Sequence, residues 1–193
     1  MEAGMLQTDI LVLGIGNILW ADEGFGVRCV EELNNRYVFA DNVRLMDGGT
    51  QGMFLLPWVS SVSHLVIFDA IDFGLEPGEL RVIWDDDVPQ YMGAKKVSMH
   101  QTGFQEVLAS ARLLNGKPEQ LALIGVQPEQ LDDYGGSLRD ITRQRIPEAI
   151  ARACSVLQYW GVPYHERATP LASVELTGPG ELEITSYELG RPL

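Results

Sequence analysis

Acidic side chains follow the short apolar runs of this 193-residue chain, and one histidine lies in a later polar loop. These residues are Asp22, Glu23, Asp47, Asp69, Asp72 and His100. Ligands of open α/β sheets collect where the strands end, so these positions are the first to consider for chemistry. Carboxylates with one imidazole, and without a thiolate, are a donor set typical of a divalent transition-metal site.

The strongest candidates within this set are Glu23, Asp69 and His100. Two carboxylates about 5 Å apart repel by roughly 3 kcal/mol at an effective dielectric constant near 20, and a proton or a cation relieves that repulsion. A neutral imidazole favours nickel or zinc over magnesium or calcium. Three protein ligands leave open coordination positions, as a catalytic or metal-sensing site requires. We therefore expect these three residues to form a metal-binding and catalytic site.

Each candidate also has an ordinary structural interpretation. Glu23 would interact with the dipole of a following helix, Asp69 would form an Asx turn at the end of a strand, and His100 would be a surface histidine. The run Asp85 to Asp87 is better explained as a solvated loop than as a metal site. The occurrence of a candidate after each of several strands favours a shared site.

The elements that must position these residues alternate between strands and helices. Apolar runs predict strands at 10–13, 43–46, 64–68, 78–84 and 121–126. Apolar periodicity predicts helices from Phe25 to Tyr37, from a cap at Thr50 to Ser60, from a cap at Thr102 through 104–114, and over 138–160 with a kink or restart at Pro147. The strand at 78–84 should be antiparallel or at an edge, because polar and apolar residues alternate along it.

This order predicts an α/β three-layer sandwich with a mostly parallel, twisted five-stranded sheet and helices on both faces. We expect one domain over residues 1–165. Residues 166–193 depart from the pattern and form a C-terminal extension, either a hairpin or a flexible segment.

Composition excludes several functional classes. The net charge is −13, which opposes binding to nucleic acid or to an anionic membrane. The sequence contains no apolar run of membrane-spanning length and no signal peptide, so we expect a cytoplasmic, monomeric protein. The two cysteines, Cys29 and Cys154, have the phase of core residues, which argues against a thiol nucleophile.

The turn at Gly14 and Gly16 invites a comparison with dinucleotide-binding loops. The third glycine of that motif would fall at position 19, where the residue is Leu19. Asp22 and Glu23 would also repel a pyrophosphate at the start of the next helix. The two glycines are better explained by a tight turn and close helix packing.

The motifs of the chain resemble the maturation endopeptidases of [NiFe] hydrogenases, the HyaD, HybD and HupD type. The segments that carry the resemblance lie between positions 9 and 162, and they are ILVLGIGN at 10–17, DEG at 22–24, GVR at 26–28, DGGT at 47–50, HLVI at 64–67, DA at 69–70, Ser98 with HQ at 100–101, and GVQP at 125–128. The segments at 20–26 and 131–138 look like the branch that serves membrane-bound uptake hydrogenases.

The resemblance implies a single endoproteolytic cut that removes a C-terminal extension from the immature hydrogenase large subunit after nickel insertion. It assigns the metal contacts to Glu23, Asp69 and His100. The metal is expected to be nickel supplied by the substrate, with cadmium or zinc as substitutes in vitro. The loop Asp47, Gly48 and Gly49 would either position the peptide or form a purely structural turn. The alternatives are a nickel-binding or chaperone module without proteolytic activity and a nucleotide-binding enzyme of related topology.

Overall fold

The computed structural model describes residues 9–93, 99–169 and 171, and it does not describe the side chains of 93 and 99–102. Its central sheet has the strand order β3-β1-β4-β6-β5. The strands are β1 (Ile10–Ile15), β3 (Val43–Gly49), β4 (His64–Ala70), β5 (Leu80–Trp84) and β6 (Gln120–Val126). The first four in this order run parallel, whereas β5 is antiparallel to β6 and forms an edge. The predicted five-stranded, mostly parallel sheet is therefore confirmed.

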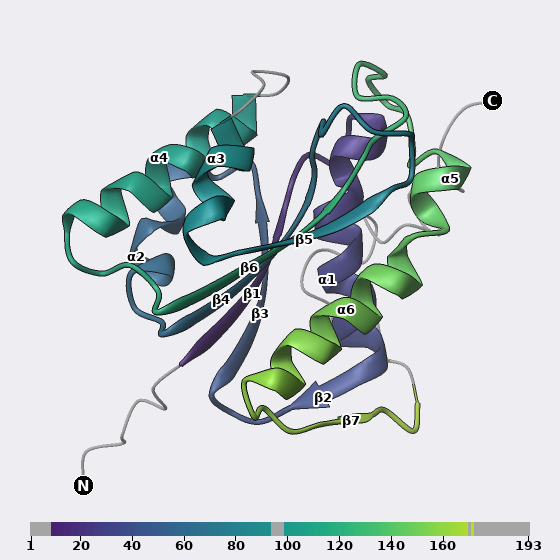
Figure 1. Cartoon of the computed structure of the whole chain (residues 1–193). Coiled ribbons are helices and arrows are strands. Elements are labelled where there is room, and N and C mark those ends of the chain that lie inside the picture. Colours follow the sequence, from purple (N-terminus) through teal and green to yellow (C-terminus); the bar gives the residue numbers. More distant parts are fainter. Residues whose placement is uncertain (1–8, 94–98, 170, 172–193) are drawn as a thin grey trace, which may run out of the picture.

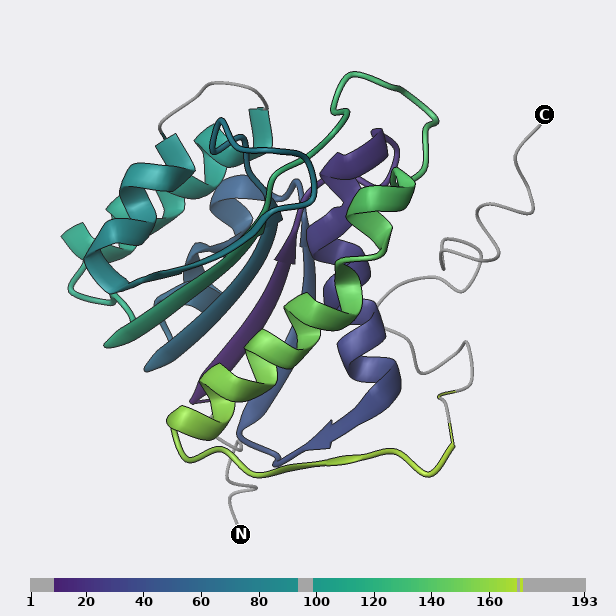
Figure 2. The same ribbon diagram turned by 45° about the vertical axis from the view of Figure 1, so that its right-hand side comes forward.

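Helices cover both faces of the sheet (Figure 1). One face carries α1 (Phe25–Arg36), α5 (Asp140–Arg143) and α6 (Ile146–Tyr159), and the other carries α2 (Leu56–Val59), α3 (Val88–Gly93) and α4 (Met99–Leu113). The turned view shows α6 lying along the sheet beside α1 (Figure 2). Short 3-10 turns precede three of these helices: η1 (Ala21–Gly24), η2 (Gly52–Leu55) and η3 (Asp85–Asp87).

The strands separate two apolar cores because neighbouring side chains of a strand point to opposite faces. Val12 packs with α1 and α6, whereas Leu13 packs with α2 and α4. Cys29 is fully buried in the first core, as its helical phase predicts. Fully apolar strands of this kind are expected where both sides of a parallel sheet are covered.

Several predicted boundaries differ from the observed ones. Of the kink or restart predicted at Pro147, the structure has the restart, so the single predicted helix over 138–160 is divided into α5 and α6. Thr50 is not the N-cap of the following helical segment, because the N-cap of η2 is Gln51. Thr102 lies inside α4, which begins three residues earlier at Met99, so the predicted cap is wrong. Capping preferences are local, whereas packing against the neighbouring elements decides where these helices begin.

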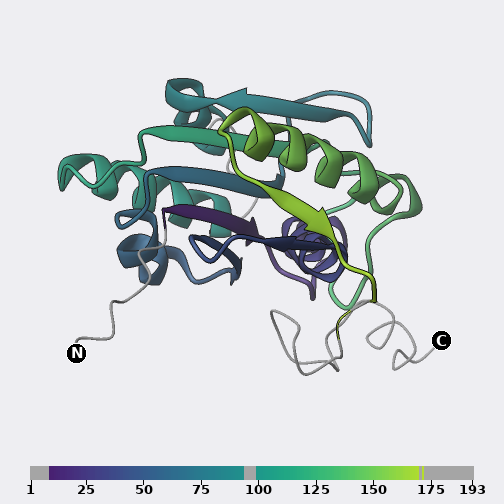
Figure 3. The same cartoon turned by 90° about the horizontal axis from the view of Figure 1, so that it is seen from below.

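The structure contains a second, two-stranded sheet that the sequence pattern does not predict. It consists of β2 (Tyr37–Phe39) and β7 (Tyr164–Glu166), which pair antiparallel (Figure 3). The apolar spacing of the preceding helix continues to Tyr37 and therefore predicts that Tyr37 belongs to that helix. Its ring instead meets the ring of Tyr164 edge-on, with 5.4 Å between the centroids. After β7, the backbone N–H of Arg167 donates to the carbonyl of Arg36, so this segment lies against the end of α1.

The first turn of α1 lies against the ends of β1 and β4. A Cβ atom added to Gly26 would stand 2.2 Å from the carbonyl oxygen of Phe68 and 2.3 Å from that of Ile15. Only glycine permits this approach, because both obstructing groups are backbone.

We therefore expect Gly26→Ala to lower the free energy of unfolding by about 2 kcal/mol or more, because the helix must move away from the sheet. Alanine favours a helix interior over glycine by about 1 kcal/mol, so local propensity predicts the opposite sign. Urea denaturation measures the change. Gly103→Ala is the matched control, since its Cβ would be 3.6 Å from the nearest described atom. Equal effects of the two substitutions would contradict the packing argument.

Candidate active site

The site begins where the chain leaves β1. Gly16 has φ = 133°, and a Cβ there would lie 1.8 Å from the carbonyl oxygen of Glu23. The backbone N–H of Asn17 donates to the same oxygen at 3.2 Å. The backbone of Glu23 is therefore held against the turn that follows β1, and its side chain is half-buried.

Asp69 reaches the same edge of the sheet from β4. The strands β1 and β4 are parallel neighbours, and the chain leaves them toward different sides of the sheet. This divergence is the topological switch point at which open α/β sheets bind ligands. The contact of Gly26 with the ends of both strands brings η1, which carries Glu23, to this point. The structure thus brings the segments of Glu23 and Asp69 together.

Asp69 is fully buried. Its Oδ1 atom accepts a hydrogen bond from the N–H of Ala70 at 2.8 Å, and its Oδ2 atom is also shielded from solvent. This bond runs to the next residue, so it differs from the Asx turn considered above, in which the acceptor bonds two residues on. A buried carboxylate is costly unless bonds, a proton or a cation compensate it.

His100 lies in the first turn of α4, and its side chain is outside the described residues. The beginning of α4 lies near the end of β3, because Gly103 approaches Gly52 of η2. Among the side chains that the structure describes, no three His, Cys, Asp or Glu residues form a group suited to a metal ion. The trio of Glu23, Asp69 and His100 therefore stays a prediction, with two carboxylates in the described part.

A cavity of about 280 Å³ opens beside η1, between the turns that follow β1 and β3. It is lined by Gly16, Asn17, Ile18, Leu19, Val27, Asp47, Gly49 and Thr50. The Oδ1 atom of Asp47 accepts from the N–H of Gly49 at 2.8 Å, which forms an Asx turn. The loop therefore has the structural role considered above, and it also borders a cavity large enough for part of a peptide.

Arg28 faces inward, although arginine side chains are mostly exposed in folded proteins. It is 4% exposed, and its Nη1 atom lies 2.8 Å from Oε2 of Glu31. Burial raises the pKa of Asp47, whereas the bond from Gly49 and the positive charge of Arg28 act in the opposite direction. The sequence signal for this burial is the apolar character of the neighbouring residues Val27, Cys29 and Val30. In the structure, residues 25 to 30 are buried without interruption.

Asp22 is a second buried charge, and its structural role is not predicted by the sequence. Its Oδ2 atom accepts from the N–H groups of Glu129 at 2.8 Å and Gln130 at 3.0 Å, and Oδ1 accepts from that of Arg139 at 2.8 Å. These bonds fasten the loop after β6 to η1. Since the partners lie more than 100 residues away, no local pattern signals them.

Gln127 fastens the loop after β4 in a similar way. Its Oε1 atom accepts from the N–H groups of Phe73 at 2.8 Å and Leu75 at 3.1 Å, while Nε2 donates to Asp72 at 3.1 Å. Asp72 is therefore engaged in holding a loop. The acidic run at 85–87 is exposed, as expected, and Asp86 pairs with Lys117 at 2.8 Å.

The two cysteines do not supply a nucleophile. Cys29 and Cys154 are both free and buried. Burial, assisted by the negative charge of Glu32, raises the pKa of Cys29 well above its ordinary value, so its thiol stays protonated. This agrees with the structural role that their spacing predicts.

Comparison with known proteins decides the family. The family model described as "Hydrogenase maturation protease" matches residues 27–156. The chain belongs to the hydrogenase maturation protease family. Membership in this family supports endopeptidase activity. The resemblance inferred from the sequence motifs is confirmed. In the described part of the chain, no helix has the length and apolar character needed to cross a membrane.

Relatives share nearly the whole chain. The hydrogenase expression/formation protein HupD of Bradyrhizobium diazoefficiens is 53% identical over 189 residues, which cover 98% of each chain. The protein HoxM of Cupriavidus necator is 51% identical over 95% of this chain and 91% of its own. The hydrogenase maturating endopeptidase HybD from E. coli has a similar structure, with a TM-score of 0.79 and 39% identity over 83% of this chain and 98% of that one. The α/β fold is therefore the fold of this family.

We expect Asp22→Asn to lower the free energy of unfolding by about 2 to 3 kcal/mol, because the amide removes the charge and presents N–H groups where acceptors are needed. Urea denaturation measures the loss. Asp132→Asn, an exposed change in the loop that Asp22 holds, is the control and should be neutral. A loss below about 0.5 kcal/mol in Asp22→Asn would contradict the role of Asp22.

The carboxyl of Asp47 should titrate above its ordinary pKa of 3.8, since burial outweighs the stabilising bonds. The folded protein then binds more protons than the unfolded chain between these two pKa values, so the contribution of Asp47 to stability falls as pH rises through that window. Carboxyl ¹³C titration by NMR measures the midpoint. Arg28→Met should raise the midpoint further, whereas the exposed change Arg81→Met should leave it unchanged. A lower midpoint in Arg28→Met would contradict the assignment.

Proposed function

We propose that this protein is a cytoplasmic endopeptidase that removes the C-terminal extension of the nickel-loaded [NiFe] hydrogenase large-subunit precursor. Membership in the hydrogenase maturation protease family supports the reaction class. The observation that carries the assignment to a place on the molecule is the meeting of two carboxylate-bearing segments at the switch point of the sheet. The similarity to HupD and HoxM supports the uptake-hydrogenase branch.

In this proposal, Glu23, Asp69 and His100 engage the nickel that the precursor carries. Two carboxylates and an imidazole suit a borderline divalent ion. The metal is then part of the substrate, and a precursor without nickel is not recognised. Nickel supplies Lewis-acid polarisation of an oxygen when it is present.

The chain itself would supply the proton acceptor and the peptide-binding surface. Glu23 or Asp69, as a carboxylate, accepts a proton from the attacking water. The cavity beside Asp47 and Gly49 has room for the peptide next to the cut. Asp22 and Gln127 contribute indirectly, because they hold the loops around this edge.

The test is to mix the purified protein with nickel-loaded large-subunit precursor and to measure the masses of the products. Loss of one discrete C-terminal peptide supports the proposal, and the nickel-free precursor should stay intact. Transfer of nickel without cleavage would instead identify the non-proteolytic nickel-binding or chaperone module.

Glu23→Gln, Asp69→Asn and His100→Ala should each slow cleavage by roughly 10²-fold or more, because each removes either the proton acceptor or a contact to the nickel. Thermal denaturation should show that each variant is folded. Asp87→Asn removes an exposed carboxylate and should cleave at the original rate. Normal processing by all three variants would refute the site assignment.

A further inference from the structure

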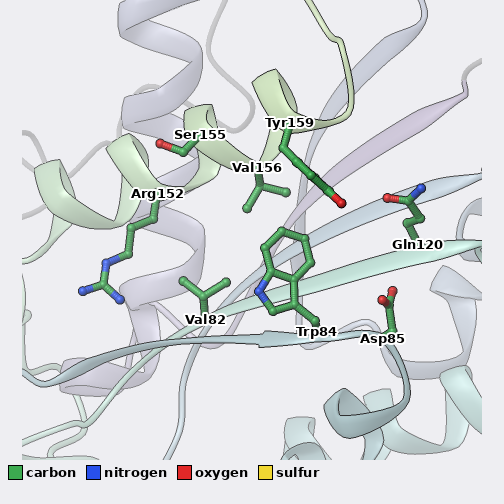
Figure 4. Close-up of a pocket in the computed structure, with 8 residues that line it drawn as sticks. All are labelled: Val82, Trp84, Asp85, Gln120, Arg152, Ser155, Val156 and Tyr159. Carbon is green, nitrogen blue, oxygen red and sulfur yellow. The ribbon is translucent and has the colours of Figure 1, made fainter.

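The opposite end of the sheet carries a second hollow that the proposed reaction does not use. We call it the β5 groove, a cavity of about 670 Å³ between the edge strand β5 and helix α6. It is lined by Val82, Trp84, Asp85, Gln120, Arg152, Ser155, Val156 and Tyr159. Figure 4 shows the side chains of β5 and α6 pointing toward one another across it.

The groove exposes large apolar side chains. Trp84 is 39% exposed and Tyr159 is 78% exposed, and their rings meet edge-on with 6.1 Å between the centroids. On α6, the lining residues follow the spacing i, i+3, i+4 and i+7 from Arg152, so one continuous stripe of the helix faces the groove. Exposed aromatic surface beside a concave site is typical of a place that binds another molecule.

The edge of β5 also offers unpaired backbone groups. Gln127 donates its N–H to the carbonyl of Glu79 at 2.8 Å, and the register continues through Leu80 with Val126 and Arg81 with Gly125. In an antiparallel ladder, residues that bond to the neighbouring strand alternate with residues whose backbone groups point the other way. The backbone groups of Arg81 and Ile83 therefore bond to β6, whereas those of Leu80, Val82 and Trp84 point away from it.

An independent contact agrees with this alternation. The carbonyl of Leu80 accepts from Nη1 of Arg152 at 3.2 Å, so it faces outward. Among the described strands, β5 is the last of the sheet, and β6 is its one strand neighbour there. The N–H and C=O groups of Val82 and Trp84 therefore border the groove that their side chains line.

From this juxtaposition we propose that β5 accepts an extended segment of another protein as an added strand. Main-chain bonds to Val82 and Trp84 supply the pairing, and the groove receives every second side chain of the segment. The segment carries apolar side chains at alternate positions, because one face of it lies against Trp84 and Tyr159.

The charge of the edge selects a basic partner. Three exposed aspartates, Asp85 to Asp87, follow β5 directly. The cations of this edge each pair with a carboxylate, and these pairs are Arg81 with Glu79, Lys117 with Asp86 and Arg152 with Glu148. Asp85 and Asp87 add further negative charge, and the whole chain carries −13. A second copy of this chain is a poor occupant. Antiparallel pairing of two β5 strands about Val82 would place Glu79 opposite Asp85 of the other copy, and like charges directly opposed destabilise a sheet. We therefore assign the groove to a segment with lysine or arginine between its apolar residues.

The probe is an acetylated and amidated peptide of alternating lysine and valine, about eight residues long, which is within the usual length of a strand. Added to the ¹⁵N-labelled full chain, it should shift the amide signals of Val82 and Trp84 with a Kd on the order of 1 mM or tighter. A peptide with glutamate in place of lysine should bind roughly tenfold more weakly. A peptide with alternate amides N-methylated should not bind, because it cannot pair with an edge strand.

Two substitutions test whether the peptide binds at β5 and in the groove. Val82→Pro removes an outward N–H while leaving the bonds to β6, a position where edge strands tolerate proline, and it should abolish binding. Ser155→Lys adds a like charge inside the groove without touching β5 and should weaken binding roughly tenfold. Gln158→Lys makes the same charge change at an exposed position outside the groove and should have no effect.

The proposal is overturned if neither amide shifts at a peptide concentration of about 10 mM. It is also overturned if the acidic or N-methylated peptide binds equally well, or if Ser155→Lys and Gln158→Lys behave alike. Self-association that Ser155→Lys abolishes would show that a second copy occupies the groove instead. No hydrogenase precursor is used, so these outcomes are independent of the cleavage assay.

Discussion

The contact of helix α1 with the ends of β1 and β4 is the constraint on which the site depends. The backbone of Gly26 lies against two carbonyl groups of the sheet, and no side chain fits between them. This contact places η1, with Glu23, at the point where the chain diverges from the two central parallel strands. Asp69 reaches the same point by ending β4. A helix held farther from the sheet would separate the two carboxylates while leaving each element intact.

Around this contact, buried polar groups hold the loops. Asp22 and Gln127 accept backbone N–H groups from the loops after β6 and β4. The first of these loops also bonds to η1 through its backbone, where the N–H of Asp22 donates to the carbonyl of Gln130 at 3.0 Å. Arg28 is buried beside Glu31, and its positive charge lowers the pKa of Asp47, so it is a third buried polar group near the turn that follows β3. Buried charges are costly unless they are bonded, which makes such loops well defined and sensitive to single substitutions. A site that must cut one bond of a protein substrate benefits from loops fixed in this way.

The two ends of the sheet differ in chemical character. The end with Glu23 and Asp69 is acidic, and loop N–H groups there donate to the side chains of Asp22, Asp47 and Gln127. The β5 groove exposes aromatic rings and leaves backbone groups of an edge strand unused by the sheet. The antiparallel direction of β5 causes this difference, because it turns the last strand away from the switch point and leaves its own end beside α6.

The sequence by itself determined the five central strands, an antiparallel or edge position for β5, an interruption of the last helix at Pro147, the burial of both cysteines and the family. Apolar periodicity and short motifs record local geometry, which is why these features could be predicted. Only the tertiary structure decided the short sheet of β2 and β7, the start of α4 and the burial of Arg28 and Asp22. These depend on contacts between distant segments, such as Asp22 with Arg139, which leave no periodic signal. The sequence could identify Glu23 and Asp69 by type and position, but only the packing of α1 on the strand ends brings their segments together.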